Sequence, residues 1–275
     1  MTLAELLRKT RTRFQEAGLP TPELDAKFLM QDILGLTDPD TALTSEQEAL
    51  AERAILRRLN GEPVSRIAGF REFWGRRFYL SPATLDPRPD TETLIEAALA
   101  RAWSAPPRIL DLGTGTGCIL LTLLHEIRGS TGVGIDISPE AISTARRNAM
   151  EQNLSSRVEF MCSNWTESVS GTFDLIVSNP PYIPSATILN LHPEVQNHDP
   201  ILALDGGEDG LAPYKILLPT LKKFLVPGGV VFFEVGIRQA GDIAGLVRDS
   251  NATLSRTYDD LGGVTRVLEI QYGDN

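Results

Sequence analysis

The sequence predicts an α/β fold with a smaller helical module at its N-terminus. Residues 1–60 read as amphipathic helices, whereas from residue 107 onward short apolar runs alternate with helical stretches. Such alternation is typical of a parallel sheet covered by helices on both faces. With 275 residues, 42% of them hydrophobic, the chain can form one large domain or two modest ones. We expect a helical domain over 1–70, a hairpin and linker over 71–89, and a sheet domain over 90–275.

Three helix starts are visible in the N-terminal module. Thr2 and Glu5 have the spacing of a capping box, in which the two side chains satisfy each other's backbone N–H groups. The run Thr21-Pro22-Glu23 places proline at the first helical position, and Ser45 with Glu48 repeats the capping-box spacing. No cluster of catalytic side chains stands out here, so we expect the chemistry elsewhere.

The remainder of the chain shows the turns and the alternating strand and helix segments of an α/β domain. Residues 71–80 read as a hairpin around Gly75, and 81–89 are interrupted by prolines, as at a domain junction. Ligands of open parallel sheets bind at the carboxyl ends of the strands, where the strand order switches. Strands are expected at 108–111, 132–137, 158–162, 173–178, 229–235 and 264–270, with helices at 117–128, 139–153 and 213–224.

Charge and cysteine content restrict the partners. The formal net charge is -10, and residues 1–80 carry equal numbers of basic and acidic residues, so the acidic excess lies in the sheet domain. An acidic surface repels phosphate backbones, and we expect no direct nucleic-acid partner. Two cysteines, Cys118 and Cys162, are too few for a disulfide framework or a four-ligand zinc site. We expect them to be buried free thiols in a reducing compartment.

Metal and membrane sites are also not expected. The histidines at positions 125, 192 and 198 lack the spacing of a helical metal motif. The N-terminus carries an early acid and no long apolar run, unlike a signal peptide. The longest apolar stretch, near 217–235, is broken by two lysines and by Pro227-Gly228-Gly229. We therefore expect a cytoplasmic protein.

A glycine-rich turn follows the first strand. Its sequence is Asp111-Leu112-Gly113-Thr114-Gly115-Thr116-Gly117, and a helix comes directly after it. Alternating glycines allow a sharp turn and a close approach of a ligand to the backbone. The spacing differs from the dinucleotide fingerprint, and Asp111 would repel a pyrophosphate. A carboxylate at this place suits a cationic ligand such as the sulfonium end of S-adenosylmethionine.

Two further strand ends complete the predicted cofactor site. The second strand ends in Asp136, whose carboxylate is placed to accept both hydroxyls of a ribose. The alternative, an N-cap role for Asp136, is disfavoured because Ser138 already fills that role. The third strand leads into Trp165, which either borders an adenine or packs in the core.

The most specific signal follows the fourth strand, where the chain reads Asn179-Pro180-Pro181-Tyr182. Two prolines end the strand ladder and stiffen the loop. The Asn179 carboxamide oxygen and the Pro180 carbonyl can then accept both hydrogens of a planar NH2 group, on which Tyr182 can stack. An amide nitrogen is a poor nucleophile, so we expect catalysis by placement and charge redistribution, without a strong general base.

This turn resembles that of the amino-methyltransferases, which modify planar NH2 groups on adenine, cytosine or glutamine. Longer runs are similar to one branch, the glutamine methyltransferases of peptide-chain release factors (the PrmC or HemK family). These runs are Glu62-Pro63, Arg71-Glu72-Phe73-Trp74-Gly75, Pro87-Arg88-Pro89-Asp90-Thr91-Glu92 and the loop from Glu194 to Leu211. The resemblance covers nearly the whole chain.

The resemblance implies a Rossmann-like methyltransferase sheet that uses S-adenosylmethionine, with a helical N-terminal domain that docks the substrate. It implies that 113–117, Asp136 and Trp165 hold the cofactor, beside Asp111 and Asn179. Asn179 to Tyr182 would hold the glutamine of a Gly-Gly-Gln tripeptide in the release factor. The implied reaction is methylation of the glutamine side-chain nitrogen, N5, with Asn179, Pro180 and Tyr182 as catalytic residues.

Three other functions stay open. A sister enzyme would methylate a glutamine in a ribosomal protein. An adenine-N6 methyltransferase would act on DNA, against which stand the acidic sheet domain and the lack of a sizeable recognition domain. A cofactor-binding module without catalysis is disfavoured by the intact run from Asn179 to Tyr182.

Overall fold

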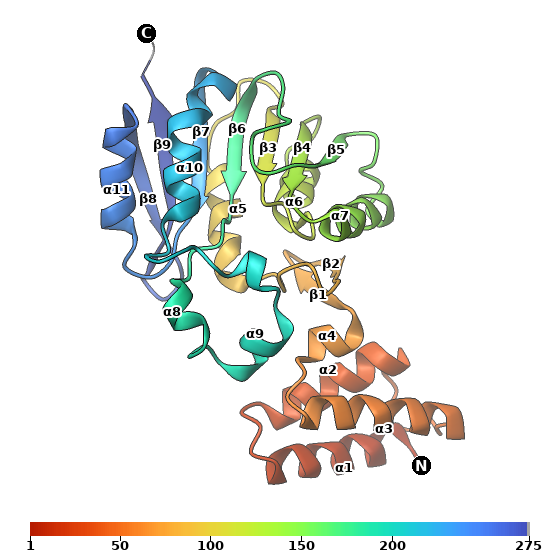
Figure 1. Ribbon diagram of the computed structural model, residues 1–275. Coiled ribbons are helices and arrows are strands. Elements are labelled where there is room, and N and C mark those ends of the chain that lie inside the picture. The colour runs from red at the N-terminus through yellow and green to blue at the C-terminus, as the bar shows by residue number, and fades with distance from the viewer. Residues whose placement is uncertain (274–275) are drawn as a thin grey trace. The chain divides into compact units, whose positions relative to one another are not determined.

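The computed structural model describes residues 1–273, which form two compact units (Figure 1). One unit comprises Met1–Arg71 and the short segment His192–His198. The other comprises Glu72–Leu191 and the chain from Asp199 onward. The division at Arg71 places nearly all of the segment 71–89 in the second unit, and the last two residues of the predicted 90–275 range lie outside the described residues.

Residues 1–71 of the N-terminal unit form four helices around their own apolar core. The capping box predicted for Thr2 and Glu5 is confirmed. The prediction for the third helix was wrong by one residue, because the extended Thr44 caps it and its hydroxyl accepts from the Gln47 N–H at 3.2 Å. The helices are α1 (Leu3–Glu16), α2 (Pro22–Leu34), α3 (Ser45–Leu59) and α4 (Val64–Ala68).

A short helix from the middle of the chain, α9 (Pro193–His198), belongs to this N-terminal unit. Its Glu194 accepts a hydrogen bond at 2.7 Å from Arg58, and the same guanidinium binds Asp25 at 2.7 Å. The Arg58 side chain is only 4% exposed. A buried guanidinium needs such acidic partners, since an unpaired buried charge is costly.

The second unit begins within β1 (Phe70–Phe73), which forms a hairpin with β2 (Arg76–Tyr79). Trp74 and Gly75 make its turn with φ values of 51° and 67°. Phe73 and Phe78 are buried and belong to the same core as the sheet and its first helices. The predicted hairpin is therefore part of the sheet unit's packing.

The central sheet has seven strands in the order β5-β4-β3-β6-β7-β9-β8 (Figure 1). The first five of this order are parallel, whereas β9 runs antiparallel to both β7 and β8. The sheet is therefore mixed at one edge, and β8 was not predicted. The strands are β3 (Arg108–Leu112), β4 (Thr131–Asp136), β5 (Val158–Cys162), β6 (Phe173–Ser178), β7 (Leu225–Glu234), β8 (Ala252–Asp259) and β9 (Thr265–Tyr272).

Helices cover both faces of this sheet (Figure 1). Along β7 the side chains of Val230 and Phe232 enter one core, and those of Val231 and Phe233 enter the other. This explains why the strand reads as a continuous apolar run. The first face is covered by α5 (Glu92–Leu99), α6 (Cys118–Glu126) and α7 (Pro139–Glu151), and the second by α10 (Ala212–Leu221) and α11 (Ala240–Asp249).

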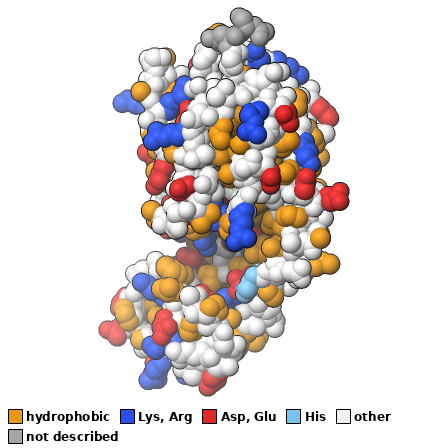
Figure 2. Space-filling view, turned by 90° about the vertical axis from the view of Figure 1, so that its left-hand side faces the viewer, with side chains coloured by type: hydrophobic (Ala, Val, Ile, Leu, Met, Phe, Trp, Pro, Cys, Tyr) orange, Lys and Arg blue, Asp and Glu red, His pale blue; other side chains and the backbone are white. Residues whose placement is uncertain are grey.

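The surface in Figure 2 shows acidic and basic side chains interspersed with apolar ones. No helix within residues 1–273 is long and apolar enough to cross a bilayer. Over the same residues, no three His, Cys, Asp or Glu side chains gather closely enough to hold a metal ion. Cys162 is exposed, contrary to the expectation of a buried thiol, whereas Cys118 is partly buried.

Candidate active site

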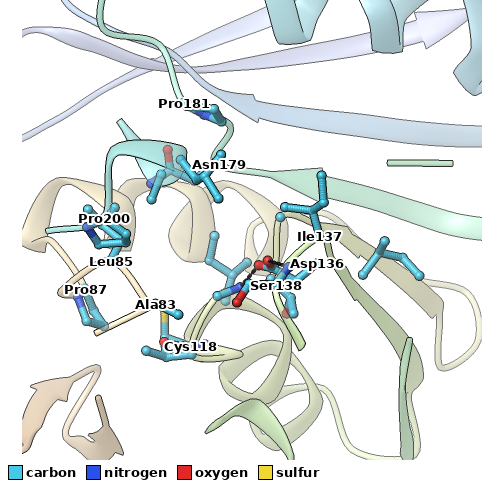
Figure 3. Close-up of a pocket in the computed structure, with 18 of the residues that line it drawn as sticks. Ala83, Leu85, Pro87, Cys118, Asp136, Ile137, Ser138, Asn179, Pro181 and Pro200 are labelled. Atoms are coloured by element: carbon cyan, nitrogen blue, oxygen red, sulfur yellow. Dashed lines mark hydrogen bonds between the residues drawn. The ribbon is translucent and has the colours of Figure 1, made fainter. Parts of the chain in front are cut away.

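A cavity of about 370 Å3 lies at the carboxyl ends of β3, β4 and β6. From β3 the chain continues to β4 and β5 on one side and then returns to β6 on the other side of β3. The strand order therefore reverses at this place. Crevices for ligands form at such switch points. Figure 3 shows Asn179 and Pro181 at one part of the cavity and Asp136 with Ser138 at another.

The glycine turn after β3 lines this cavity with Gly113, Thr114, Gly115 and Thr116. Gly115 has φ 55°, and a Cβ there would have no atom within 4 Å. Its backbone is therefore open to a ligand, in a conformation that favours glycine.

Gly117, another predicted cofactor residue, packs against the helices behind the turn and does not line the cavity. Its φ is 80°, and a Cβ there would lie 3.1 Å from the Leu121 side chain. Gly117 therefore serves the tight start of α6, whose N-cap it forms.

Asp111 stands behind the turn. It is fully buried and is absent from the cavity lining; its Oδ2 accepts a hydrogen bond from the Thr114 hydroxyl at 2.6 Å. Among the described residues its Oδ1 has no hydrogen-bond partner. Burial raises the pKa of Asp111 to about 7, the Thr114 hydrogen bond lowers it, and nearby Asp136 raises it further. In this conformation Asp111 acts on the cavity through Thr114.

Asp136 ends β4 and lines the cavity directly. Its two oxygens accept from the backbone N–H of Gly115 and of Ser138, each at 2.9 Å. Ser138 caps α7 through a hydrogen bond from the Ala141 N–H, as predicted. A carboxylate has about four acceptor positions, so Asp136 keeps capacity for ligand hydroxyls while it fixes the glycine turn. Burial raises its pKa.

Trp165 also lines the cavity and lies against the glycine turn. A Cβ built on Gly113 would lie 3.6 Å from the indole ring. The backbone of Trp165 has φ 46°, a strained conformation for a bulky residue and one that often marks functional sites. Its ring also packs against the second core, so the two interpretations of Trp165, ligand border and packing, are compatible.

The run Asn179-Pro180-Pro181-Tyr182 leaves β6 at the same cavity. Asn179 and Pro181 line it, whereas Pro180 is buried and Tyr182 does not belong to the lining. The Asn179 Nδ2 donates to the Thr91 hydroxyl at 3.2 Å. Among the described residues the only side-chain hydrogen bond of Asn179 is this one, so its Oδ1 is the free acceptor of the carboxamide.

Tyr182 points to the strand beside the turn. Its hydroxyl donates to Glu234 Oε1 at 3.4 Å, and burial raises its pKa. Gln239 holds its backbone, because the Gln239 Nε2 donates to the Tyr182 carbonyl at 2.9 Å. In this conformation the ring is part of the turn's support, and stacking on a substrate stays a prediction.

Three supporting residues were missed at the level of sequence: Thr91, Glu234 and Gln239. Glu234 ends the buried strand β7, and Asp111 and Asp136 stand in the same way near the ends of β3 and β4. This shared position of an acid at a strand end could have identified Glu234 from the sequence. The segment 81–89 was expected to be a linker, yet Ala83, Leu85, Pro87 and Arg88 line the cavity, as do Pro200, Leu202 and Ala203.

Both units match known families. Residues 5–69 match the PrmC N-terminal domain, and residues 84–192 match the methyltransferase small domain. A solved methyltransferase from Pyrococcus furiosus shares the fold, with a TM-score of 0.56 and 20% identity over 84% of this chain and 100% of that chain.

Full-length relatives are more informative. The release factor glutamine methyltransferase of Agrobacterium fabrum is 46% identical over 97% of this chain and 96% of its own length. That of Rhodospirillum rubrum is 47% identical over 98% of this chain and 84% of its own length. With this identity over nearly the whole length, the chain belongs to the release factor glutamine methyltransferases, a family of enzymes that use S-adenosylmethionine.

Proposed function

We propose that this protein methylates the side-chain nitrogen, N5, of the glutamine in the Gly-Gly-Gln loop of peptide-chain release factors. One observation carries the proposal. The Asn179 carboxamide, tied by its nitrogen to Thr91, leaves its oxygen free at the cavity that also contains Asp136 and the glycine turn. An acceptor oxygen beside a cofactor site suits a substrate that presents an NH2 group.

The cavity fits S-adenosylmethionine by the chemistry of its lining. Its volume of about 370 Å3 is within the range of small-molecule sites. The open backbone at Gly115 and the spare lone pairs of Asp136 suit an amino acid end and a ribose, respectively. Ile137 and Trp165 supply apolar surface for a base. When bound, the cofactor supplies an electrophilic methyl group.

The chain's residues would act by placement. In our proposal the Asn179 Oδ1 and the Pro180 carbonyl accept the two hydrogens of the glutamine NH2. This fork turns the nitrogen lone pair toward the methyl group and stabilises the positive charge that develops on nitrogen. With the cofactor bound, the nitrogen so placed would take the methyl carbon from sulfur, and the extra proton would then leave the nitrogen to water.

The helical unit is proposed to dock the body of the release factor. On α2, Leu24 and Phe28 are four residues apart and 52% and 48% exposed, so they form a small apolar patch on one side of the helix. The segment α9, which follows the acceptor turn in the chain, belongs to the same unit. Because release factors act in translation, this proposal places the reaction in the cytoplasm.

A methyl-transfer assay with parallel acceptors tests the proposal. The purified chain and radiolabelled S-adenosylmethionine would be incubated with an intact release factor, with ribosomal protein, or with duplex DNA. We expect label in the release factor alone. Label in ribosomal protein or DNA, with an unlabelled release factor, would replace this proposal by the corresponding alternative.

A further inference from the structure

The glycine-rich segment 205–211 takes no part in the reaction described so far. Its residues do not line the cavity. Instead, the segment runs beside the chain that leaves the acceptor turn. The Ile183 N–H donates to the Leu204 carbonyl at 3.0 Å, and the Gly206 N–H donates to the Ile183 carbonyl at 2.9 Å. These two bonds form a parallel bridge, so the segment is attached to the end of the acceptor turn.

Two glycines of this segment leave no room for a side chain beside Tyr182. A Cβ on Gly206 would lie 2.8 Å from the Tyr182 Cα. A Cβ on Gly210, whose φ is 75°, would overlap the Tyr182 carbonyl oxygen. Glycine is therefore required at both positions for the segment to lie directly against the backbone of the acceptor turn.

The side chain of Gln239 connects this segment to the turn. Its Nε2 donates to the Tyr182 carbonyl at 2.9 Å and to the Gly210 carbonyl at 3.4 Å. Its Oε1 accepts from the Gly236 N–H at 2.9 Å, just beyond the end of β7. A carbonyl only accepts and a backbone N–H only donates, so the orientation of the Gln239 amide is unambiguous. One amide therefore joins three separate backbone segments.

The acceptor turn is thus held at both ends. At its start the buried Ser178 hydroxyl donates to the Leu112 carbonyl at 2.6 Å. Of the three residues between Ser178 and Tyr182, two are prolines, whose rings fix φ. Few backbone torsions remain free between the two ends. The place at which the Tyr182 backbone is held therefore restricts the direction of the Pro180 carbonyl.

We propose that Gln239 is a positioning residue that sets the direction of the Pro180 carbonyl toward the acceptor nitrogen. This inference rests on the proposed function, because it concerns the second oxygen that would receive the glutamine NH2. Gln239 does not line the cavity, so it acts through the backbone of Tyr182 and not on the reacting atoms. A small displacement of a group that orients the substrate lowers the rate of the chemical step.

Two variants of Gln239 in the full-length protein test the proposal, with the release factor as substrate. Gln239→Met keeps the length of the side chain and removes the amide. It should lower kcat about 10- to 100-fold, while calorimetry finds the Kd of S-adenosylmethionine unchanged. Gln239→Glu keeps an acceptor for the Gly236 N–H but loses both donated hydrogen bonds, so it should be at least as slow. Gln152→Met is the control, because Gln152 donates to a carbonyl elsewhere, that of Arg77, and its loss should leave kcat unchanged.

A glycine variant tests the same position from the other side. Gly210→Ala would press a methyl group against the Tyr182 carbonyl and should also lower kcat. Gly263→Ala is the matched control. Its φ of 76° causes the same backbone strain, but no atom lies within 4 Å of the added Cβ, so kcat should stay at the wild-type value.

Three results would overturn the proposal. The first is a folded Gln239→Met protein with the wild-type kcat, and the second is a Gln239→Glu protein with the wild-type kcat, which would leave only the bond to Gly236 important. The third is a loss of cofactor affinity that accompanies the loss of rate, because it would indicate general damage to the fold. If the wild-type protein transfers no methyl group to the release factor, the proposed function fails, and that result is distinct from all three.

Discussion

The two ends of the cavity are built in different ways. The cofactor end comes from neighbouring strand ends, with Asp136 holding the glycine turn through the Gly115 N–H. At the acceptor end, Asn179 binds Thr91 and Tyr182 binds Glu234, so side chains from three distant parts of the sequence meet there. The cofactor end depends mainly on backbone groups, and the acceptor end depends on side chains. Substitutions at the first should change affinity, and those at the second should change rate.

The largest effect is expected for Asn179→Ala. This change removes the free acceptor oxygen and releases the substrate nitrogen to rotate. Loss of one positioned contact of this kind costs roughly 2.7–4 kcal/mol, or about 100- to 1000-fold in kcat. Single-turnover methyl transfer to release factor, with calorimetry of cofactor binding, checks the prediction. If Asn179→Ala also lowered the cofactor affinity, it would contradict the claim that the acceptor end controls rate and the cofactor end controls affinity.

Asn179→Asp sharpens the same comparison. It keeps an acceptor oxygen but replaces the NH2 that donates to Thr91 by a second acceptor, so the hydrogen bond seen in the wild type is lost. We expect a rate between those of wild type and Asn179→Ala, because acceptance by position 179 survives while its orientation is lost. A rate equal to wild type would show that the hydrogen bond to Thr91 is dispensable.

Asp136→Asn should weaken cofactor binding. The change removes the charge and one of the two acceptors that hold the Gly115 and Ser138 N–H groups. Hydrogen bonds to charged groups contribute about 1.5–3 kcal/mol, so the Kd should rise roughly 10- to 100-fold. Calorimetry measures it. Asp174→Asn, which alters an acid that binds the Arg108 N–H at the other end of the strands, is the control. An unchanged Kd in Asp136→Asn would remove Asp136 from the cofactor site.

Arg58→Met concerns the helical unit. Arg58 joins Asp25 and Glu194, so its loss should release α9 and destabilise the unit by about 2 kcal/mol. Thermal unfolding and the rate of proteolysis near 192–198 would report both effects. Arg13→Met is the matched control, since its partner Glu52 is half exposed and such surface pairs contribute little. Equal behaviour of the two variants would contradict the anchoring role of Arg58.

The smallest effect is expected on the surface of α2. Phe28→Ser should raise the KM for intact release factor by about 1 kcal/mol, roughly fivefold, if this surface docks the substrate. The KM for a short Gly-Gly-Gln peptide should stay constant, because the peptide lacks the body of the release factor that the helical unit is proposed to dock. Met150→Ser, at an exposed apolar residue of the sheet unit, is the control. Equal KM values for Phe28→Ser and wild type would leave docking to another surface.

Sequence patterns predicted the parts of the molecule that depend on neighbouring residues. The glycine turn, Asp136 and the Ser138 cap follow from local rules, and the structure places the turn after β3, Asp136 at the end of β4 and Ser138 at the start of α7. The edge strand β8 was missed, because its exposed side chains give no continuous apolar run. The start of the third helix was predicted one residue late, at Ser45 in place of Thr44, because either hydroxyl can cap a helix and only the backbone decides.

The acceptor end was only half predictable. Asn179 and its two prolines are visible as a motif, but the hydrogen bond from Asn179 to Thr91 spans 88 positions. Asp111 was expected to face the cofactor, yet the turn folds Thr114 over it. Tertiary packing decides which residue of a motif faces the cavity and which one supports it. A local sequence pattern carries no information about this packing.

The most direct test of the account is the position of the transferred methyl group. Intact release factor would be treated with wild-type protein or with Asn179→Ala, digested, and mapped by tandem mass spectrometry. We predict one methyl group on the side-chain nitrogen of the Gly-Gly-Gln glutamine with wild type. Asn179→Ala should give the same product at a rate lower by about two to three orders of magnitude. A methyl group on another residue, or equal rates for the two proteins, would contradict the central claim that Asn179 positions the glutamine.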